Sequence, residues 1–93
     1  MAEVDDKFFI RADEHIELSN RQLAEVSMGK VSASMMYSVA RFNAYVSACG
    51  FKTGKEMADH KKDTLKYFSE EYKKMLSENL DNYIENFDEF MKH

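Results

Sequence analysis

The stretch that decides the fold is residues 53–93, which read TGKEMADHKKDTLKYFSEEYKKMLSENLDNYIENFDEFMKH. Its apolar residues recur mostly at steps of three and four, which keeps them on one face of a helix. These residues are Met57, Leu65, Phe68, Tyr72, Met75, Leu76, Leu80, Tyr83, Ile84, Phe87, Phe90 and Met91. Thr53 followed by Glu56 has the spacing of a capping box. We therefore predict one helix over about residues 54–91, a rod of roughly 60 Å.

The composition favours an all-α fold. The 93 residues include no Pro and three Gly, whereas an all-β fold needs a turn about every 8–12 residues. Ala, Leu, Met, Glu and Lys dominate the long segments, and all are good helix formers. With 44% hydrophobic and 32% charged residues, the composition is that of one soluble globular domain, residues 1–93. The expected architecture is a two-helix hairpin followed by the long C-terminal helix.

Two shorter helices are expected before the long one. The first covers about residues 5–27, with Asp5 or Asp6 as its N-cap and Gly29 as a left-handed stop. The second covers about residues 31–49 and is apolar or small almost all round. Because a helix without a polar face is usually central, we expect this second helix to be covered on several sides.

The long helix exceeds what the hairpin can cover. Helices of about 22 and 19 residues span roughly 30 Å each, so the hairpin reaches about half of the rod. Burying six large apolar residues of the other half would be worth roughly 10 kcal/mol. We therefore predict that oligomerisation completes the bundle, as a homodimer or a dimer of dimers. The expected interface residues are Leu76, Leu80, Tyr83, Ile84, Phe87, Phe90 and Met91.

The charges fit an antiparallel pair of long helices. Residues 52–74 carry seven Lys and five acids, whereas residues 77–91 carry five acids and no base. Antiparallel pairing would place the lysine-rich half of one copy beside the acidic half of the other. The alternative is a break near Ser77 to Asp81, with the last segment folding back as a fourth helix of a monomeric bundle. A kink near residues 60–63 is compatible with either arrangement.

Several stretches match a known family pattern. They are Arg11-Ala-Asp-Glu-His-Ile-Glu-Leu-Ser-Asn20, Val31-Ser-Ala-Ser-Met-Met-Tyr37, Ala40-Arg-Phe-Asn-Ala44, and the run from Tyr67-Phe68 through Tyr72-Lys-Lys-Met-Leu76 to Asn79-Leu80-Asp-Asn-Tyr-Ile84. Together they cover most of the chain and resemble an uncharacterised family of small bacterial proteins, domain of unknown function 3144. The resemblance implies a proteobacterial origin and an intracellular helical protein. It implies no activity and no catalytic residues.

Five polar residues on the first two expected helices form the candidate functional site. They are His15, Asn20, Tyr37, Arg41 and Asn43. In the structural interpretation, which we favour, they fix the packing of the second helix, because polar groups in a core are usually satisfied by hydrogen bonds. In the functional interpretation they line a pocket between the two helices, and Arg41 binds a carboxylate or phosphate.

Arg41 is the most informative of these residues. It is the only charged residue in residues 31–51. A buried guanidinium needs a carboxylate partner, because an unpaired charge in a core is strongly destabilising. The candidate partners are Asp13, Glu14, Glu17 and Glu71.

Other motifs do not indicate chemistry. The chain lacks the His-x3-His and Glu-x2-His spacings of metal-binding helices, so no metal and no cofactor is expected. The single Cys49 follows a helix C-terminus, where the dipole disfavours a thiolate, and it fits a reducing compartment. The lysine-rich stretch is interrupted by acids in a chain with a pI of about 5.3, so no nucleic-acid partner is expected.

The expected location is the cytoplasm. No run of 18 or more apolar residues could span a membrane, and the N-terminus lacks the apolar region of a signal peptide. The predicted function is a non-catalytic protein-interaction or scaffolding role, with self-association and an unknown protein partner. The alternative is a small enzyme or ligand-binding protein with a polar pocket around Arg41 and His15.

Overall fold

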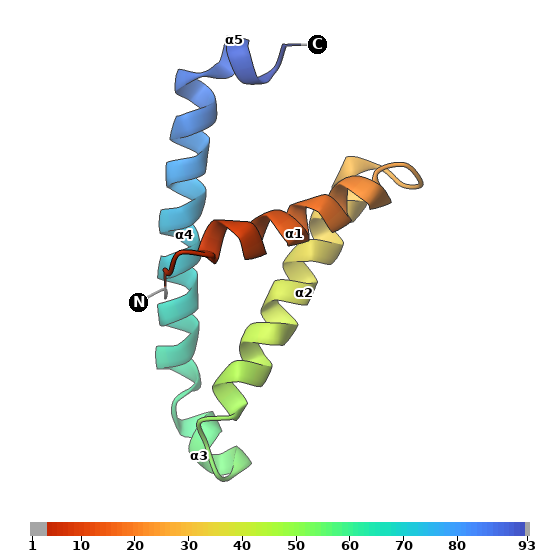
Figure 1. Ribbon diagram of the computed structural model, residues 1–93. Helices are drawn as coiled ribbons and strands as arrows, with labels where there is room; N and C mark the ends of the chain where they lie inside the picture. The colour runs from red at the N-terminus through yellow and green to blue at the C-terminus, as the bar shows by residue number, and fades with distance from the viewer. Residues whose placement is uncertain (1–3, 93) are drawn as a thin grey trace. The chain divides into compact units, whose positions relative to one another are not determined.

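The computed structural model describes residues 4–92, which form an all-α fold (Figure 1). The helices are α1 (Phe8–Gln22), α2 (Met28–Ala48), α3 (Gly54–Asp59), α4 (Lys61–Glu85) and α5 (Phe87–Phe90). The hairpin of α1 and α2 forms one compact unit that ends at Gly54, and the residues from Lys55 onward form a second. The all-α prediction is confirmed, whereas the prediction of a single domain stays a prediction.

Asp5 organises the start of α1, although it lies before the helix. Its carboxylate accepts a hydrogen bond from the Lys7 backbone N–H at 2.8 Å and pairs with the Arg11 guanidinium at 2.9 Å. The residue before the first helical position is Lys7, which makes no side-chain cap. Asp5 therefore satisfies a backbone donor, as expected of a capping residue, but the helix covers Phe8–Gln22 rather than residues 5–27.

The expected role of Gly29 was wrong. None of the glycines in the described part of the chain has a positive φ, and Gly29 lies in the first turn of α2. Ser27 is the N-cap, and its hydroxyl accepts a hydrogen bond from the Lys30 backbone N–H at 3.4 Å. The physical reason is that serine is a strong N-cap, so a new helix begins beside it before Gly29 is reached. As a result α2 begins at Met28 instead of residue 31.

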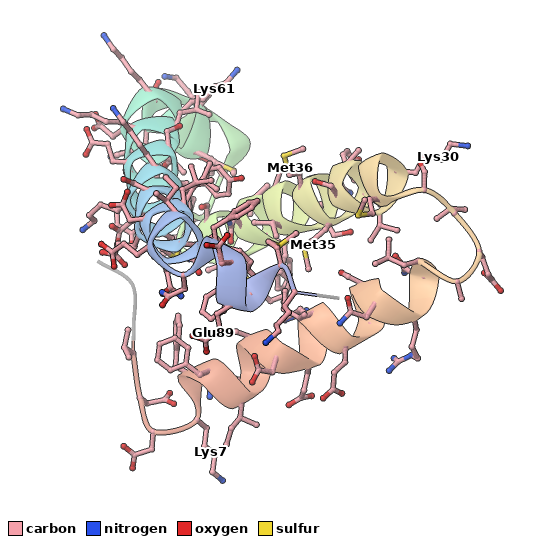
Figure 2. The ribbon with its side chains drawn as sticks, turned by 90° about the horizontal axis from the view of Figure 1, so that it is seen from above. Lys7, Lys30, Met35, Met36, Lys61 and Glu89 are labelled. Carbon is pink, nitrogen blue, oxygen red and sulfur yellow. The ribbon has the colours of Figure 1, made fainter. Side chains whose placement is uncertain are left out.

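The helices α1 and α2 pack together near their connection and diverge toward their other ends (Figure 1). Val31 is 6% exposed and is the one buried residue in residues 4–92. The Ser19 hydroxyl lies 3.8 Å from the Met35 sulfur, which places these residues at the contact. In Figure 2, Met35 points toward α1 and Met36 points to the opposite side of α2.

Within the hairpin unit α1 covers only the start of α2, so the expectation of a central helix covered on several sides stays a prediction. Beyond Met35, its apolar residues Val39, Phe42, Tyr45 and Val46 are all exposed. The physical reason is length and direction, because α1 has 15 residues against 21 in α2 and diverges from it. A helix that is apolar on all sides can be buried on all sides, but it is buried only where another helix packs against it.

The expected long helix is interrupted at His60. This residue has φ −104° and ψ 4°, which separates α3 from α4, and the kink expected near residues 60–63 therefore falls there. Its ring nitrogen Nδ1 lies 3.0 Å from the Glu56 carbonyl oxygen. The alternative of a break near Ser77 to Asp81 was wrong, since α4 continues through both residues to Glu85.

A second interruption at Asn86 separates α4 from α5. The Asn86 side-chain amide donates to the Asn82 carbonyl oxygen at 2.9 Å and lies 3.0 Å from the Asn82 Oδ1. The turn brings the Phe90 ring against Tyr83, with centroids 5.1 Å apart at 72°. The single helix expected over residues 54–91 is thus corrected to three segments, which are separated at His60 and at Asn86.

Candidate functional site

The most extensive feature of the second unit is an exposed apolar surface on α4 and α5, here called the C-terminal apolar face. All seven of its large side chains are exposed, from 43% for Leu76 to 70% for Ile84. They are Leu76, Leu80, Tyr83, Ile84, Phe87, Phe90 and Met91. The structure thus leaves all seven predicted interface residues accessible. So many exposed large apolar side chains on a short segment of a small protein usually mark an interaction site.

The face results from the spacing of its residues along α4. Leu76, Leu80, Tyr83 and Ile84 follow one another at steps of four, three and one, which brings them to one side of the helix. The turn at Asn86 then keeps Phe90 on the same surface, because its ring packs edge-on against Tyr83. This edge-to-face contact is favourable for aromatic rings and orders the last turn.

The segment that carries this face is strongly acidic. Residues 76–91, here called the acidic segment, contain five carboxylates and no base. The carboxylates are Glu78, Asp81, Glu85, Asp88 and Glu89. The ion pairs found within residues 4–92 do not involve any of these five carboxylates. The segment therefore combines apolar side chains with uncompensated negative charge, and both features favour a basic apolar partner.

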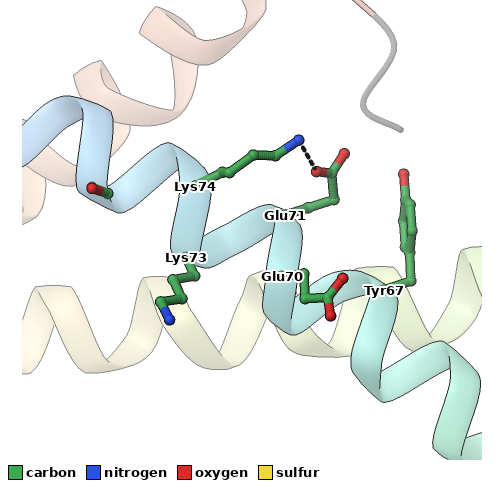
Figure 3. Close-up of a pocket in the computed structure, with 6 residues that line it drawn as sticks. Tyr67, Glu70, Glu71, Lys73 and Lys74 are labelled. Carbon is green, nitrogen blue, oxygen red and sulfur yellow. Dashed lines mark ion pairs between the residues drawn. The ribbon is translucent and has the colours of Figure 1, made fainter.

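A shallow hollow on α4 lies in the preceding turns (Figure 3). Its lining residues are Tyr67, Glu70, Glu71, Lys73, Lys74 and Ser77, all from α4. The Lys74 ammonium pairs with the Glu71 carboxylate at 3.1 Å, and the Glu71 side chain is only 13% exposed. The hydrogen bond and the negative charge of Glu71 raise the pKa of Lys74. Sequence reasoning missed this hollow, although the three-residue spacing of Glu71 and Lys74 predicts their pairing.

An exposed ion pair also fixes the start of α1. The pKa of Asp5 is lowered, mainly because the Arg11 side chain donates hydrogen bonds to its carboxylate and secondly because the Lys7 backbone N–H does. The same pair raises the pKa of Arg11. The two side chains are both more than half exposed, so the contact positions the N-terminal turn without forming a site of low dielectric constant.

The polar cluster expected on the first two helices is dispersed at the surface. His15, Asn20, Tyr37 and Arg41 are exposed, and Asn43 is half-buried. The Asn43 carbonyl oxygen accepts a hydrogen bond from the Ser47 hydroxyl, a contact within α2. Among the described residues no hydrogen bond joins two members of the cluster. Whether these residues act together stays a prediction.

Arg41 is exposed in the hairpin unit, and its expected burial and pairing with a carboxylate stays a prediction. Its side chain is exposed, and none of the ion pairs within residues 4–92 joins it to Asp13, Glu14 or Glu17. Within this unit α1 does not cover α2 beyond Met35, so the exposed guanidinium keeps its hydration. The fourth candidate, Glu71, lies in the second unit and pairs with Lys74 on α4.

Three further properties concern metal, thiol and membrane chemistry. In residues 4–92 no three His, Cys, Asp or Glu side chains converge as a metal site. Cys49 is a free, exposed thiol directly after the last residue of α2. None of the described helices has the length and apolar character needed to cross a membrane.

The fold and the exposed surfaces define a small all-α protein whose helices present apolar faces. A family model described as protein of unknown function (DUF3144) matches residues 8–84, and the chain belongs to this family. It is also similar to the NMR structure of the protein NB7890A from the proteobacterial genus Shewanella, with 38% identity and a TM-score of 0.79. That similarity covers 97% of this chain and 96% of the other. No curated protein matches the chain.

Proposed function

We propose that this protein has a non-catalytic protein-interaction or scaffolding role and that it works as a homo-oligomer, a dimer or a dimer of dimers. The observation that carries the proposal is the C-terminal apolar face, whose seven large side chains are all exposed. A surface of this kind is stable in water only at a cost, and a second copy of the chain offers a matching cover.

The energetics support self-association. Full burial of a large apolar side chain is worth about 1.5–3 kcal/mol, so seven side chains that are roughly half exposed leave roughly 5–10 kcal/mol unused. That amount is comparable with the whole stability of a small domain. The hairpin unit adds exposed apolar residues of its own on α2, among them Phe42 and Val46. Assembly between copies would remove both surfaces from water.

The alternative function, an enzyme with a pocket around Arg41 and His15, lacks a supporting observation. Both side chains are exposed, and the hollow found in the second unit lies on α4 instead. The ion pair of Glu71 with Lys74 in this hollow joins two residues of the same helix. Exposed pairs of this kind are common structural features of helices and do not by themselves indicate catalysis.

The test is the dependence of the molecular mass on protein concentration, measured by size-exclusion chromatography with light scattering. We expect a double variant, Leu80→Ala with Ile84→Ala, to raise the dimer dissociation constant by about 100-fold, which corresponds to about 3 kcal/mol. Alanine is the best helix former, so α4 should persist, and circular dichroism checks this.

The matched control is Glu70→Ala with Ser77→Ala. These residues lie on α4 within the hollow and outside the C-terminal apolar face, so the dissociation constant should change by less than about threefold. A wild-type chain that elutes with the mass of one copy at every concentration would contradict the proposal. An equal effect of the two double variants would show that the apolar face is not the association surface.

A further inference from the structure

The helix α2 carries an apolar stripe that is covered at one end only. Val31, Met35, Val39, Phe42 and Val46 follow one another at steps of three and four, and they are here called the α2 stripe. The first two contribute to the contact with α1, where Val31 is 6% exposed. Beyond this contact the stripe continues without cover, and Phe42 is 64% exposed.

The sequence around the uncovered part of the stripe contains no carboxylate. From Val26 to Lys55 the chain contains four bases and no carboxylate. Two of these bases, Lys30 and Arg41, belong to α2, and both are exposed. The ion pairs of residues 4–92 do not include Lys30 or Arg41. A helix that docks here would therefore be favoured by carboxylates beside its apolar residues.

The chain itself contains a helix with this chemistry. The acidic segment, residues 76–91, has seven large exposed apolar side chains, five carboxylates and no base. We infer that the acidic segment of a second copy docks on the uncovered part of the α2 stripe, with its carboxylates near Arg41. The inference rests on the proposed self-association and specifies which surface of the second copy receives the C-terminal apolar face.

The start of α4 is the other surface of the chain on which the acidic segment could dock, because it also carries lysines. It is less suitable, since residues 61–74 contain three carboxylates beside their five lysines. One of these carboxylates, Glu71, already pairs with Lys74 on the same helix. In contrast, α2 has two exposed bases and no carboxylate to repel the acidic segment.

The proposed contact can close as a symmetric dimer. Each copy offers one α2 stripe and one acidic segment, so two copies can exchange them and make the same contact twice. Because both contacts form together, the second is favoured by the high effective concentration created by the first. In a closed pair both α2 stripes are occupied, so no free docking surface remains that could extend the assembly into a filament.

The first experiment maps the contact by photo-crosslinking in the full chain. A benzophenone side chain replaces Phe42, and the variant is mixed with isotope-labelled wild-type protein before illumination. We expect crosslinks between labelled and unlabelled chains that map to residues 76–91. The same group in place of Ala40, which is exposed and lies two positions away on another side of α2, should give few crosslinks there.

The outcomes separate this inference from the proposed function. A dimer whose crosslinks from position 42 map to residues 61–74 would retain self-association and overturn the docking on α2. Crosslinks confined to one chain would overturn it as well. A wild-type chain with the mass of one copy at all concentrations would contradict both proposals.

The second experiment tests the charge complementarity. Arg41→Glu should raise the dimer dissociation constant by about tenfold at low salt, because it places a carboxylate beside the acidic segment, whereas Arg41→Lys should change it by less than about threefold. The matched control is Lys66→Glu, the same charge change on α4, which should have the smaller effect. A larger effect of Lys66→Glu than of Arg41→Glu would contradict docking on α2 and favour an antiparallel pair of α4 helices.

Discussion

The two units of this protein differ in how much of their apolar surface finds a neighbour within the unit. In the hairpin unit α1 covers the start of the α2 stripe, and Val31 is buried. In the second unit α4 is longer than any other helix, and none of its residues is fully buried. The difference shows that an amphipathic pattern fixes the helix and its apolar side, whereas burial depends on a neighbour of sufficient length.

The largest effect on monomer stability is expected at the contact between α1 and α2. Val31→Ala should lower the free energy of unfolding by about 2 kcal/mol, because it removes two buried methyl groups. The measurement is urea denaturation at a concentration where the chain is a single copy. Under the same conditions Val39→Ala, on the exposed part of the stripe, should change it by less than about 0.5 kcal/mol. Equal losses of unfolding free energy in the two variants would contradict the difference in burial between the two parts of the α2 stripe.

The cap of α2 should contribute the next largest effect. Ser27→Ala removes the acceptor for the Lys30 backbone N–H and should lower the free energy of unfolding by about 1 kcal/mol. Ser27→Asp should retain the stability, since aspartate is an equally good cap. Ser38→Ala is the control within the same helix, because the Ser38 hydroxyl bonds only to the Ser34 carbonyl oxygen. A loss at Ser38 as large as that at Ser27 would argue against the cap.

A stabilising change is expected at Gly29. Its φ is not positive, and a Cβ built there meets nothing within 4 Å. Gly29→Ala should therefore raise the free energy of unfolding by about 0.5–1 kcal/mol, seen as a higher Tm in a thermal melt. Gly54→Ala in α3 also has open space and should raise it by a smaller amount, because it begins a helix of six residues. Destabilisation by Gly29→Ala would restore the left-handed stop expected from the sequence.

The smallest effect concerns pH. The pKa of Asp5 is lowered by the Arg11 side chain, so the contact stabilises the fold when the carboxyl is ionised. Its contribution is present above the usual value of 3.8 and is lost as the pH falls through the lower pKa of the folded state. In an NMR titration of the carboxyl carbon, Arg11→Gln should raise the pKa of Asp5 toward 3.8, whereas Arg21→Gln should leave it unchanged. An unchanged Asp5 pKa in Arg11→Gln would show that this ion pair does not form.

The sequence was sufficient to predict the helical class, the family and the exposed apolar residues of α4. These conclusions rest on spacing, which a helix converts directly into a face. The sequence was not sufficient to predict helix boundaries where two local signals compete. Ser27 favours a new helix while Gly29 favours a stop, and only the packed hairpin shows that the N-cap is used.

The candidate site was predictable to a smaller extent. The apolar residues from Leu76 to Met91 are exposed, and their role as an interface stays a prediction. The burial of Arg41 could not be predicted from its apolar neighbours in the sequence, because burial depends on what packs against α2. The pairing of Glu71 with Lys74 was readable from a spacing of three but does not by itself indicate a function.

The most direct test of the central claim is sedimentation equilibrium of the wild-type chain over a range of concentrations. If apolar faces of α2, α4 and α5 are covered by a second copy, the mass should rise to twice the 10.9 kDa of one chain, or to four times that value for a dimer of dimers. A mass of one chain at every concentration would contradict the account.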